Sequence, residues 1–414
     1  MQEYDLLIAP IGSLVTCESD KPRNGESLRE LPIITNGAIG IKDGKISFVG
    51  KYDDLDNFKA KEIINAENKM VTPGLIDCHT HIPFVGDRSN EMIMKLEGKG
   101  YMEIGKSGGG ILNTMKNVRV ASFESLLSSA KKAQEKLLQN GVTSFEGKSG
   151  YGLDFENEVK QLKVLRELNP AQKVISTCLS AHFLPPEFRN KRENYIELVT
   201  NKILPFVKVN NLADFADVFC EDGAFTIEES REILLKAKEL RLLTRIHADE
   251  IECYGGGKLA AEIGCKSADH LLMADDETID SLKEKSVVAV LLPATAFFLR
   301  KPYARARKFI EKGCIIAVAS DLNPGSSYTY SMIMVLNIAV FGMGLFPEEA
   351  IWASTLNSAY ALGIENEVGS IEVGKRGDIS IWDVCDPIHL FYPFGQNPLC
   401  CVVLDGKVVL RNGI

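Results

Sequence analysis

The sequence predicts an α/β protein: a (β/α)8 barrel of the TIM type, with a small β-sandwich domain that both ends of the chain build together. Three observations indicate this fold. Through the middle of the chain, strand-like runs alternate with helical stretches. Five of the six histidines each end one of those runs. Both ends of the chain instead hold short strand-like segments joined by Asp-Gly turns.

The two ends of the chain predict one composite β-domain. Near the start, Ala38–Lys42 and Lys45–Val49 flank Asp43-Gly44, and Asp5–Ile8 is a further strand-like run. Near the end, Asp405-Gly406 separates two runs in the same way. Asp-Gly between alternating runs is a strong hairpin signal. We therefore expect residues 1–68 and 369–414 to form this domain, and residues 69–368 to form the barrel.

Eight strand-like runs in the middle segment predict the barrel. Residues 226–241 show the helical pattern most clearly, since Thr226 and Glu229 form a possible capping box before an apolar stripe. Functional groups of such barrels sit at the carboxyl ends of the strands. The predicted strands end near His81, Lys148, His182, Glu221, His247, His270, Pro293 and Asp321.

Composition excludes several classes of protein. The chain has 414 residues, 45% hydrophobic and 25% charged, and a net charge of −9 that argues against nucleic-acid binding. The longest apolar run, Val287 to Leu299, has 13 residues, too few to span a membrane. The first residues lack the basic start of a signal peptide, so a cytoplasmic protein is expected. The ten cysteines contain no C-x-x-C pair, which favours reduced thiols.

The strongest motif is the segment Pro73 to His81, which reads P-G-L-I-D-C-H-T-H. Side chains on a strand alternate between its faces, so His79 and His81 are expected to point the same way. Two imidazoles at this spacing can converge on one divalent metal ion. The alternative is a pair of polar loop residues, which the preceding apolar strand disfavours.

Later strand ends supply further candidate ligands and a candidate base. His247 and Asp321 end the fifth and eighth predicted strands and could complete a site of three imidazoles and one carboxylate. Such a site suits zinc or iron(II) and leaves room for a water. Glu250 could act as the base for that water; alone, it reads more simply as a carboxylate at a helix N-terminus. His270 ends the sixth strand and is either catalytic or structural.

Loop residues after the strands offer contacts for a substrate. Arg88, in G-D-R-S, could hold a carboxylate with two hydrogen bonds, although its spacing alone favours a surface arginine. Tyr151 and His182 could each hydrogen-bond a ligand, and Asn323 and Gly325 would lie beside the metal. The run Gly108-Gly109-Gly110 indicates a flexible turn, and the loop 82–110 could act as a lid.

Taken together, these motifs resemble the amidohydrolase superfamily and, within it, the imidazolonepropionase family. The resemblance covers most of the chain. Its most specific parts are G-D-R-S at 86–89 and K-S-G-Y-G-L-D at 148–154. It also includes D-C-H-T-H at 77–81, H-A-D-E at 247–250, S-A-D-H-L at 267–271 and D-x-N-P-G at 321–325.

The resemblance implies an activity and a role for each site residue. The implied reaction is hydrolysis of the cyclic amide of 4-imidazolone-5-propanoate, a small anion, to N-formimidoyl-L-glutamate in histidine degradation. One Zn²⁺ or Fe²⁺/Fe³⁺ ion per subunit of a homodimer is implied. Its implied ligands are His79, His81, His247 and Asp321. Proton transfer falls to Glu250, His270 and Asp321. Substrate contacts fall to Arg88, Tyr151, His182, Glu250, Asn323, Gly325 and Ser326.

Two alternatives stay open at this point. Another cyclic-amide hydrolase, or an aminohydrolase such as a deaminase of a purine or pyrimidine, would use the same metal. A deaminase has less need of an arginine that binds a carboxylate. A scaffold protein that has lost its metal should have lost its ligands first. The fourth predicted strand ends in Phe219-Cys220-Glu221-Asp222 without the lysine that bridges two metals in related enzymes, so one metal is expected.

Overall fold

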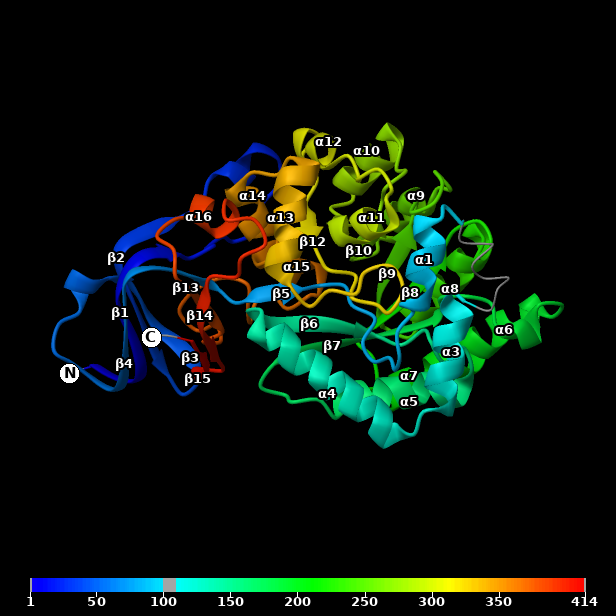
Figure 1. Cartoon of the computed structure of the whole chain (residues 1–414), viewed down its shortest axis with the longest axis horizontal. Helices are drawn as coiled ribbons and strands as arrows, with labels where there is room; N and C mark the ends of the chain where they lie inside the picture. The colour runs from blue at the N-terminus through cyan, green and yellow to red at the C-terminus, as the bar shows by residue number, and fades with distance from the viewer. Residues whose placement is uncertain (1, 100–108, 413–414) are drawn as a thin grey trace.

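The protein, seen here as a computed structural model that describes residues 2–99 and 109–412, contains an eight-stranded parallel sheet and a seven-stranded sheet (Figure 1). The seven-stranded sheet joins both ends of the chain, because β13 (Ile379–Trp382) pairs antiparallel with β4 (Phe58–Pro73). This arrangement confirms the predicted small β-domain. Its strand order is β15-β14-β13-β4-β1-β2-β3, and the remaining members are β1 (Gln2–Val15), β2 (Ile33–Lys42), β3 (Lys45–Lys51), β14 (Leu399–Leu404) and β15 (Lys407–Arg411).

The seven-stranded sheet folds over on itself around a core of its own. Buried aliphatic side chains from β1, β2, β4, β13 and β14 form one cluster, which includes Ile8, Ile41 and Ile381. The hairpin turns at Gly44 and Gly406 meet, since a Cβ on Gly406 would lie 2.8 Å from Gly44 Cα. The domain is therefore one continuous bent sheet whose two halves face each other.

Both predicted Asp-Gly hairpins are confirmed. Asp43 and Gly44 have φ angles of 51° and 76°, and Asp405 and Gly406 have 52° and 73°. Two successive positive φ angles are typical of the type I′ turn, whose twist matches that of paired strands. Asp and Gly are the residues that tolerate this conformation best.

The eight parallel strands form the predicted barrel, in the order β12-β11-β10-β9-β8-β7-β6-β5. The open ends meet just beyond β5 and β12, where His81 N donates to Leu322 O at 2.9 Å and Asp321 N donates to His79 O at 3.0 Å. The strands are β5 (Leu75–Asp77), β6 (Val142–Lys148), β7 (Lys173–Ala181), β8 (Phe215–Cys220), β9 (Leu243–Ala248), β10 (Ser267–His270), β11 (Val288–Leu291) and β12 (Ile316–Val318).

The first barrel strand is shorter than the sequence predicts. The expected run continues to His81, but the ladder between β5 and β6 ends at Asp77. Beyond Asp77 the backbone no longer pairs with β6. It forms hydrogen bonds with the segment that follows β12, and these bonds close the barrel. Only Gly74 separates β4 from β5, so the chain enters the barrel directly from the terminal sheet. The exact domain boundaries at 68/69 and 368/369 stay a prediction.

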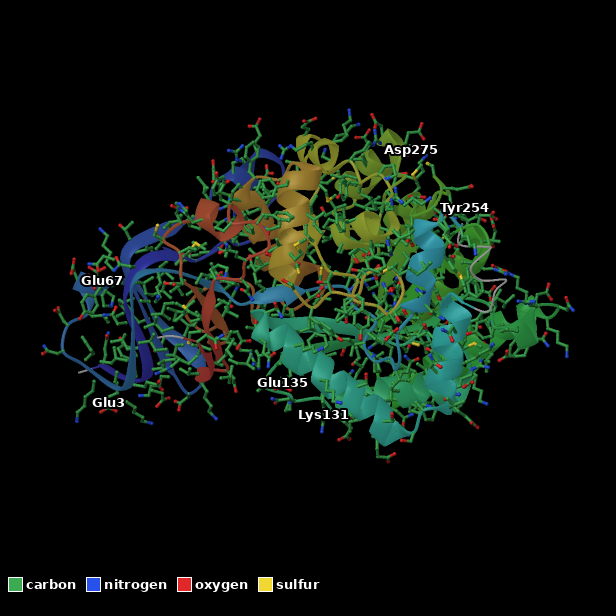
Figure 2. The ribbon with its side chains drawn as sticks, viewed as in Figure 1. Glu3, Glu67, Lys131, Glu135, Tyr254 and Asp275 are labelled. Carbon is green, nitrogen blue, oxygen red and sulfur yellow. The ribbon has the colours of Figure 1, made fainter. Side chains whose placement is uncertain are left out.

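Helices cover the outside of the barrel (Figure 1). Thr226 and Glu229 form the predicted capping box at the start of α8. On α4, Leu126, Ala130 and Leu137 are buried, while Lys131 and Glu135 point to solvent (Figure 2). The helices are α1 (Asn90–Leu96), α3 (Ile111–Val120), α4 (Phe123–Gln139), α5 (Phe155–Arg166), α6 (Arg192–Leu198), α7 (Leu204–Val209), α8 (Ile227–Glu239), α9 (Gly256–Ile263), α10 (Asp276–Glu284), α11 (Pro293–Leu299), α12 (Ala306–Glu311), α13 (Met332–Met343), α14 (Pro347–Ala353), α15 (Leu356–Ala361) and α16 (Pro387–Phe391).

Two further expectations concern the whole chain. All ten cysteines are unpaired and eight of them are buried, in line with reduced thiols. Within 2–99 and 109–412, no helix is both long enough and apolar enough to cross a bilayer. Part of the loop 82–110, including Gly108 of the glycine run, lies outside the described residues.

Candidate metal centre

Four predicted ligands converge at the carboxyl ends of the barrel strands. Asp321 Oδ1 lies 3.2 Å from His81 Nε2 and 3.6 Å from His79 Nε2. His247 Nε2 lies 3.4 Å from His81 Nε2. Donor atoms bound tetrahedrally to one zinc ion, at about 2.0–2.1 Å each, lie about 3.3 Å apart. His79, His81 and Asp321 therefore offer donor atoms that all lie within 4.8 Å of one another, and His247 joins this group through its contact with His81.

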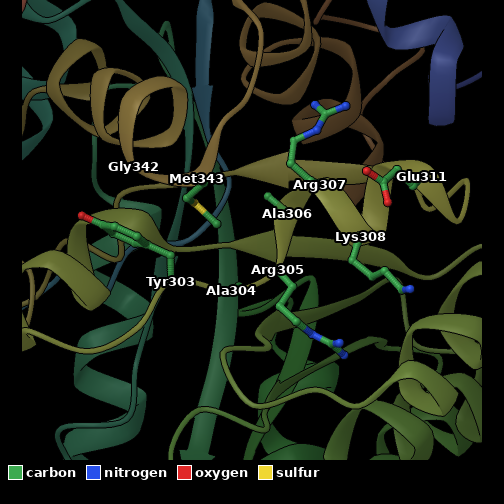
Figure 3. A pocket seen from close by; sticks show the side chains of 9 residues that line it. All are labelled: Tyr303, Ala304, Arg305, Ala306, Arg307, Lys308, Glu311, Gly342 and Met343. Carbon is green, nitrogen blue, oxygen red and sulfur yellow. The ribbon is translucent and has the colours of Figure 1, made fainter.

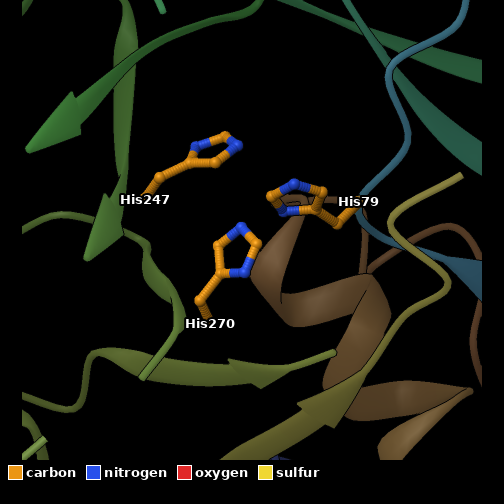
Figure 4. Close-up of side chains that lie close together, drawn as sticks. All are labelled: His79, His247 and His270. Atoms are coloured by element: carbon orange, nitrogen blue, oxygen red, sulfur yellow. The ribbon is translucent and has the colours of Figure 1, made fainter. Parts of the chain in front are cut away.

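Carboxylates behind two of these histidines orient their rings. His79 Nδ1 is hydrogen-bonded to Asp269 Oδ2 at 2.7 Å, and His247 Nδ1 lies 3.1 Å from Asp217 Oδ2. The rings of His79, His247 and His270 lie close together (Figure 4), and these three residues form a further group that could hold a metal ion. His79 Nε2 and Asp321 Oδ1 are buried and have no hydrogen-bond partner among the described residues. Buried nitrogen and oxygen atoms that lack a hydrogen-bond partner can offer their lone pairs to a bound cation.

Burial keeps the imidazoles neutral, the form in which they bind metals. Burial lowers the pKa of His81 to about 4, although the nearby Asp321 carboxylate acts to raise it. It also lowers the pKa of His79 well below its usual value and lowers that of His247. For Asp321, burial acts to raise the pKa, but its interactions with His81 and His270 and the hydrogen bond from Thr295 outweigh burial and lower the pKa. Lone pairs and a carboxylate are thus available together.

Glu250 stands beside the centre with its side chain close to His270. Its Oε2 atom lies 3.7 Å from His270 Nε2, and burial followed by the charge of Asp321 raises its pKa to about 8. Asp249, and not Glu250, is the carboxylate that accepts hydrogen bonds at the helix N-terminus. Asp249 accepts from Gly255 N at 2.7 Å and Gly257 N at 3.0 Å, at the start of α9.

Tyr151 and His182 flank the centre from the loops after β6 and β7. The rings of His182 and His81 are stacked with their centroids 5.0 Å apart, and the Tyr151 ring lies 5.8 Å from that of His81. Buried Glu158 accepts hydrogen bonds from the backbone of this loop, including those of Gly152 and Leu153 at 2.8 Å. Hydrogen bonds to Glu158 therefore fix the backbone of the loop that carries Tyr151.

Arg88 reaches the loop that follows Asp321. A Cβ on Gly325 would lie 1.0 Å from Arg88 Nη2, so the guanidinium occupies the space beside this glycine. Asn323 Oδ1 accepts from Gly325 N at 2.8 Å and from Ser326 N at 2.7 Å, which fixes the turn. The structure thus brings Arg88, Asn323, Gly325 and Ser326 into one group beside the candidate ligands.

Several buried charged residues next to the ligands escaped the sequence reading. They share a position inside the barrel strands, one layer below the histidines. For Arg245 and Asp269 the available signal was a charge within an otherwise apolar strand, two residues and one residue before a histidine. These residues are Glu146, Lys148, Asp217, Arg245 and Asp269, all at most 1% exposed. Thr295, which donates to Asp321 Oδ2 at 2.6 Å, and Glu221, which accepts from Glu250 N at 3.0 Å, were missed as well.

A separate hollow of about 490 Å³ lies outside the barrel, between α12 and α13 (Figure 3). Its cations already have partners, since Arg305 and Lys308 lie within 2.7 Å and 3.5 Å of Asp276, and Arg307 lies 2.5 Å from Glu349. It contains none of the predicted site residues. We therefore place the chemistry at the histidine cluster.

Comparison with solved structures shows the same fold in two deaminases. A zinc-bound adenosine deaminase from Xanthomonas campestris superposes with a TM-score of 0.75 at 17% identity, over 99% of this chain and 94% of that one. Guanine deaminase from E. coli gives a TM-score of 0.72 at 16% identity, over 98% and 99%. At this identity the likeness concerns the fold alone.

Comparison of sequences is more specific. The imidazolonepropionase of Geobacillus sp. (strain WCH70) is 45% identical over 99% of this chain and 98% of the relative. That of Clostridium tetani is 42% identical over the full length of both chains. The amidohydrolase family matches residues 70–409. The chain therefore belongs to the amidohydrolase family and, within it, to the imidazolonepropionases.

Proposed function

We propose that the protein hydrolyses 4-imidazolone-5-propanoate to N-formimidoyl-L-glutamate. Relatives named imidazolonepropionase, 42–45% identical over nearly the whole chain, support the substrate. The observation that carries the reaction class is the convergence of three Nε2 atoms and one carboxylate oxygen in a buried site. The deaminases share the fold, but their sequence identity of 16–17% is too low to indicate a common substrate.

The proposed ligands of one Zn²⁺ or Fe²⁺/Fe³⁺ ion are His79, His81, His247 and Asp321. When bound, such an ion lowers the pKa of water and provides hydroxide near neutral pH. Imidazole and carboxylate donors accept either metal, so availability decides between them. Asp269 and Asp217 support this assignment because Asp269 is hydrogen-bonded to His79 Nδ1 and Asp217 lies beside His247 Nδ1, so that Nε2 of each ring can bind the metal.

Glu250 and His270 would move the protons of the reaction. Hydrolysis requires a proton to leave the attacking water and another to reach the ring nitrogen as the C–N bond breaks. The carboxyl group of Glu250, 3.7 Å from His270 Nε2 and with a raised pKa, can hold a proton between these steps. Asp321 is a further candidate for the first proton, and groups this close titrate together.

Arg88 would orient the substrate through its propionate. A guanidinium matches a carboxylate with two parallel hydrogen bonds. Binding the tail at Arg88 would direct the ring toward Tyr151, His182 and the proposed ligands, and so convert binding energy into orientation. Asn323, Gly325 and Ser326 would complete the contacts to the ring or to the product.

The test is turnover of 4-imidazolone-5-propanoate, followed through loss of ring absorbance. Activity should disappear on chelation and return with Zn²⁺ or Fe²⁺. Absence of turnover from protein that carries one equivalent of metal would rule out this substrate but not the proposed hydrolytic site.

We also propose a cytoplasmic homodimer. The exposed, contacting rings of Phe341 and Phe394, with centroids 5.7 Å apart, offer an apolar patch for it, and light scattering would test the assembly.

A further inference from the structure

A layer of buried charges lies directly beneath the candidate ligands. Five residues make up this charged layer, and each is at most 1% exposed. Interiors of such barrels are ordinarily packed with branched apolar side chains. The charged layer comprises Glu146 and Lys148 on β6, Asp217 on β8, Arg245 on β9 and Asp269 on β10.

One arm of the layer leads to His79. Asp269 Oδ2 accepts from His79 Nδ1 at 2.7 Å and from Arg245 Nη2 at 2.6 Å. Arg245 Nη1 in turn forms an ion pair with Glu146 Oε1 at 2.7 Å. The carboxylate that orients His79 is thus itself held by a cation, and that cation is held by Glu146.

The other arm leads to His247, whose Nδ1 atom lies near a carboxylate without a hydrogen bond between them. Asp217 Oδ2 lies 3.1 Å from His247 Nδ1 and accepts from Lys148 Nζ at 2.8 Å. Lys148 Nζ also lies 2.8 Å from Glu146 Oε2. The two oxygens of Glu146 therefore join the two arms, and Thr177 Oγ1 donates a further hydrogen bond to Oε1.

Stability alone does not account for this layer. Removing five charges from water is costly, and well-packed apolar residues in place of buried ion pairs are often as stable or more stable. What apolar residues cannot do is fix which ring nitrogen of His79 and His247 carries the proton. That choice decides whether Nε2 presents a lone pair to a metal.

We propose that Glu146 is a positioning residue of the metal centre. Through Arg245 with Asp269, and through Lys148 with Asp217, it holds His79 and His247 together in the orientation and tautomer that bind a metal. This inference rests on the proposed metal site, yet it concerns side chains that do not touch substrate. Its failure can therefore be separated from a wrong substrate.

The test compares Glu146→Gln with wild type in the full-length protein. Glutamine keeps the shape but cannot neutralise two cations. Zn²⁺ affinity, measured by competition with a chromophoric chelator, should fall about 10–100-fold. In the chelated protein, ¹⁵N shifts of labelled histidines should show the Nδ1–H form of His79 and His247 in wild type and a mixture in the variant.

The matched control is Glu349→Gln. Glu349 is also fully buried and ion-paired, with Arg307 at 2.5 Å, but it lies at the start of α14, away from the layer. This variant should lose stability and keep wild-type Zn²⁺ affinity and histidine shifts. An equal loss of Zn²⁺ affinity in both variants would mean that Glu146 serves stability alone, and would overturn the proposal.

A double-mutant cycle tests the connection itself. Asp269→Asn should weaken Zn²⁺ binding, and adding Glu146→Gln should cost less than it does alone, because both act on His79. Full additivity would contradict the proposed path. If Glu146→Gln does not fold, Thr177→Val removes one hydrogen bond from Glu146 without changing charge and should weaken Zn²⁺ binding a few-fold; unchanged affinity and shifts there would overturn the proposal. These readouts need no substrate, so absence of turnover in wild type would reject only the proposed reaction.

Discussion

The guanidinium of Arg88 lies against the backbone of Gly325, where a single added carbon would come within 1.0 Å of Nη2. Two loops far apart in the sequence thus meet at a glycine. Arg88 is anchored to the same loop by its backbone, since Arg88 N donates to Pro324 O at 3.2 Å. The absence of a side chain at 325 is what lets the proposed carboxylate-binding group take its place.

Gly325→Ala should therefore displace Arg88 and weaken substrate binding. A hydrogen bond to a charged group contributes about 1.5–3 kcal/mol, and about 1.4 kcal/mol corresponds to a factor of ten. We expect KM to rise about 10–100-fold, with the metal content unchanged by atomic absorption. Arg88→Met should have a similar effect, and the double variant should be no worse than Arg88→Met. Independent, multiplying losses would show that Gly325 acts without Arg88.

Glu250→Gln should abolish most turnover while the metal stays bound. The variant keeps the shape of the side chain but cannot accept a proton, and general acid–base catalysis contributes about 10²–10⁴ in rate. Steady-state kinetics and metal analysis on one preparation separate the possibilities. Loss of the metal together with activity would make Glu250 a ligand rather than a proton carrier.

The raised pKa of Glu250 makes the stability of the metal-free protein depend on pH. Because burial raises this pKa to about 8, the folded state holds a proton that the unfolded state releases above about pH 4.3. The contribution of Glu250 to stability is thus full below that pH and is lost as pH rises through about 8.

Chelated wild type should consequently lose more stability than chelated Glu250→Gln between pH 5 and pH 8. One extra proton bound by the folded state corresponds to a slope of about 1.4 kcal/mol per pH unit at most. Urea unfolding of both proteins across this range measures the difference. Parallel curves would show that Glu250 is ionised in the folded, metal-free state.

Patterns local in sequence predicted much of this structure. The Asp-Gly hairpins at Asp43 and Asp405 and the capping box at Thr226 each depend on a few neighbouring residues, and each is present as expected. The positions of the histidines at strand ends followed from the same local alternation. The end of β5 was misjudged because the backbone beyond Asp77 pairs with a segment more than two hundred residues away.

The charged layer could not be predicted for a related reason. Asp269 and His79 are 190 residues apart in sequence. The sequence around each residue does not predict that their side chains meet. Strand alternation predicts which face a residue occupies, but not which residue of another strand it contacts. The role of Asp249 was also missed, since only the start of α9 reveals that it, and not Glu250, serves the helix.

Gln161 links two loops that we propose to contact substrate, and its removal should disturb both. Its Oε1 accepts from Tyr151 N at 3.1 Å and its Nε2 donates to Pro83 O at 2.8 Å, with the whole side chain buried. Gln161→Leu leaves that amide and that carbonyl without partners, at a cost of about 1–3 kcal/mol for each unsatisfied group. The Tyr151 loop can relieve this cost only by moving.

We expect Gln161→Leu to raise KM several-fold while Zn²⁺ affinity stays at the wild-type value, because within the described residues the hydrogen bonds of this side chain go to Tyr151 N and Pro83 O and not to the proposed metal ligands. Gln161→Glu offers a matched comparison, since it keeps the acceptor for Tyr151 N and can donate to Pro83 O only while its carboxyl group is protonated. Its KM should lie between those of wild type and Gln161→Leu. A fall in Zn²⁺ affinity equal to the rise in KM would show instead that the loops and the metal centre move as one unit.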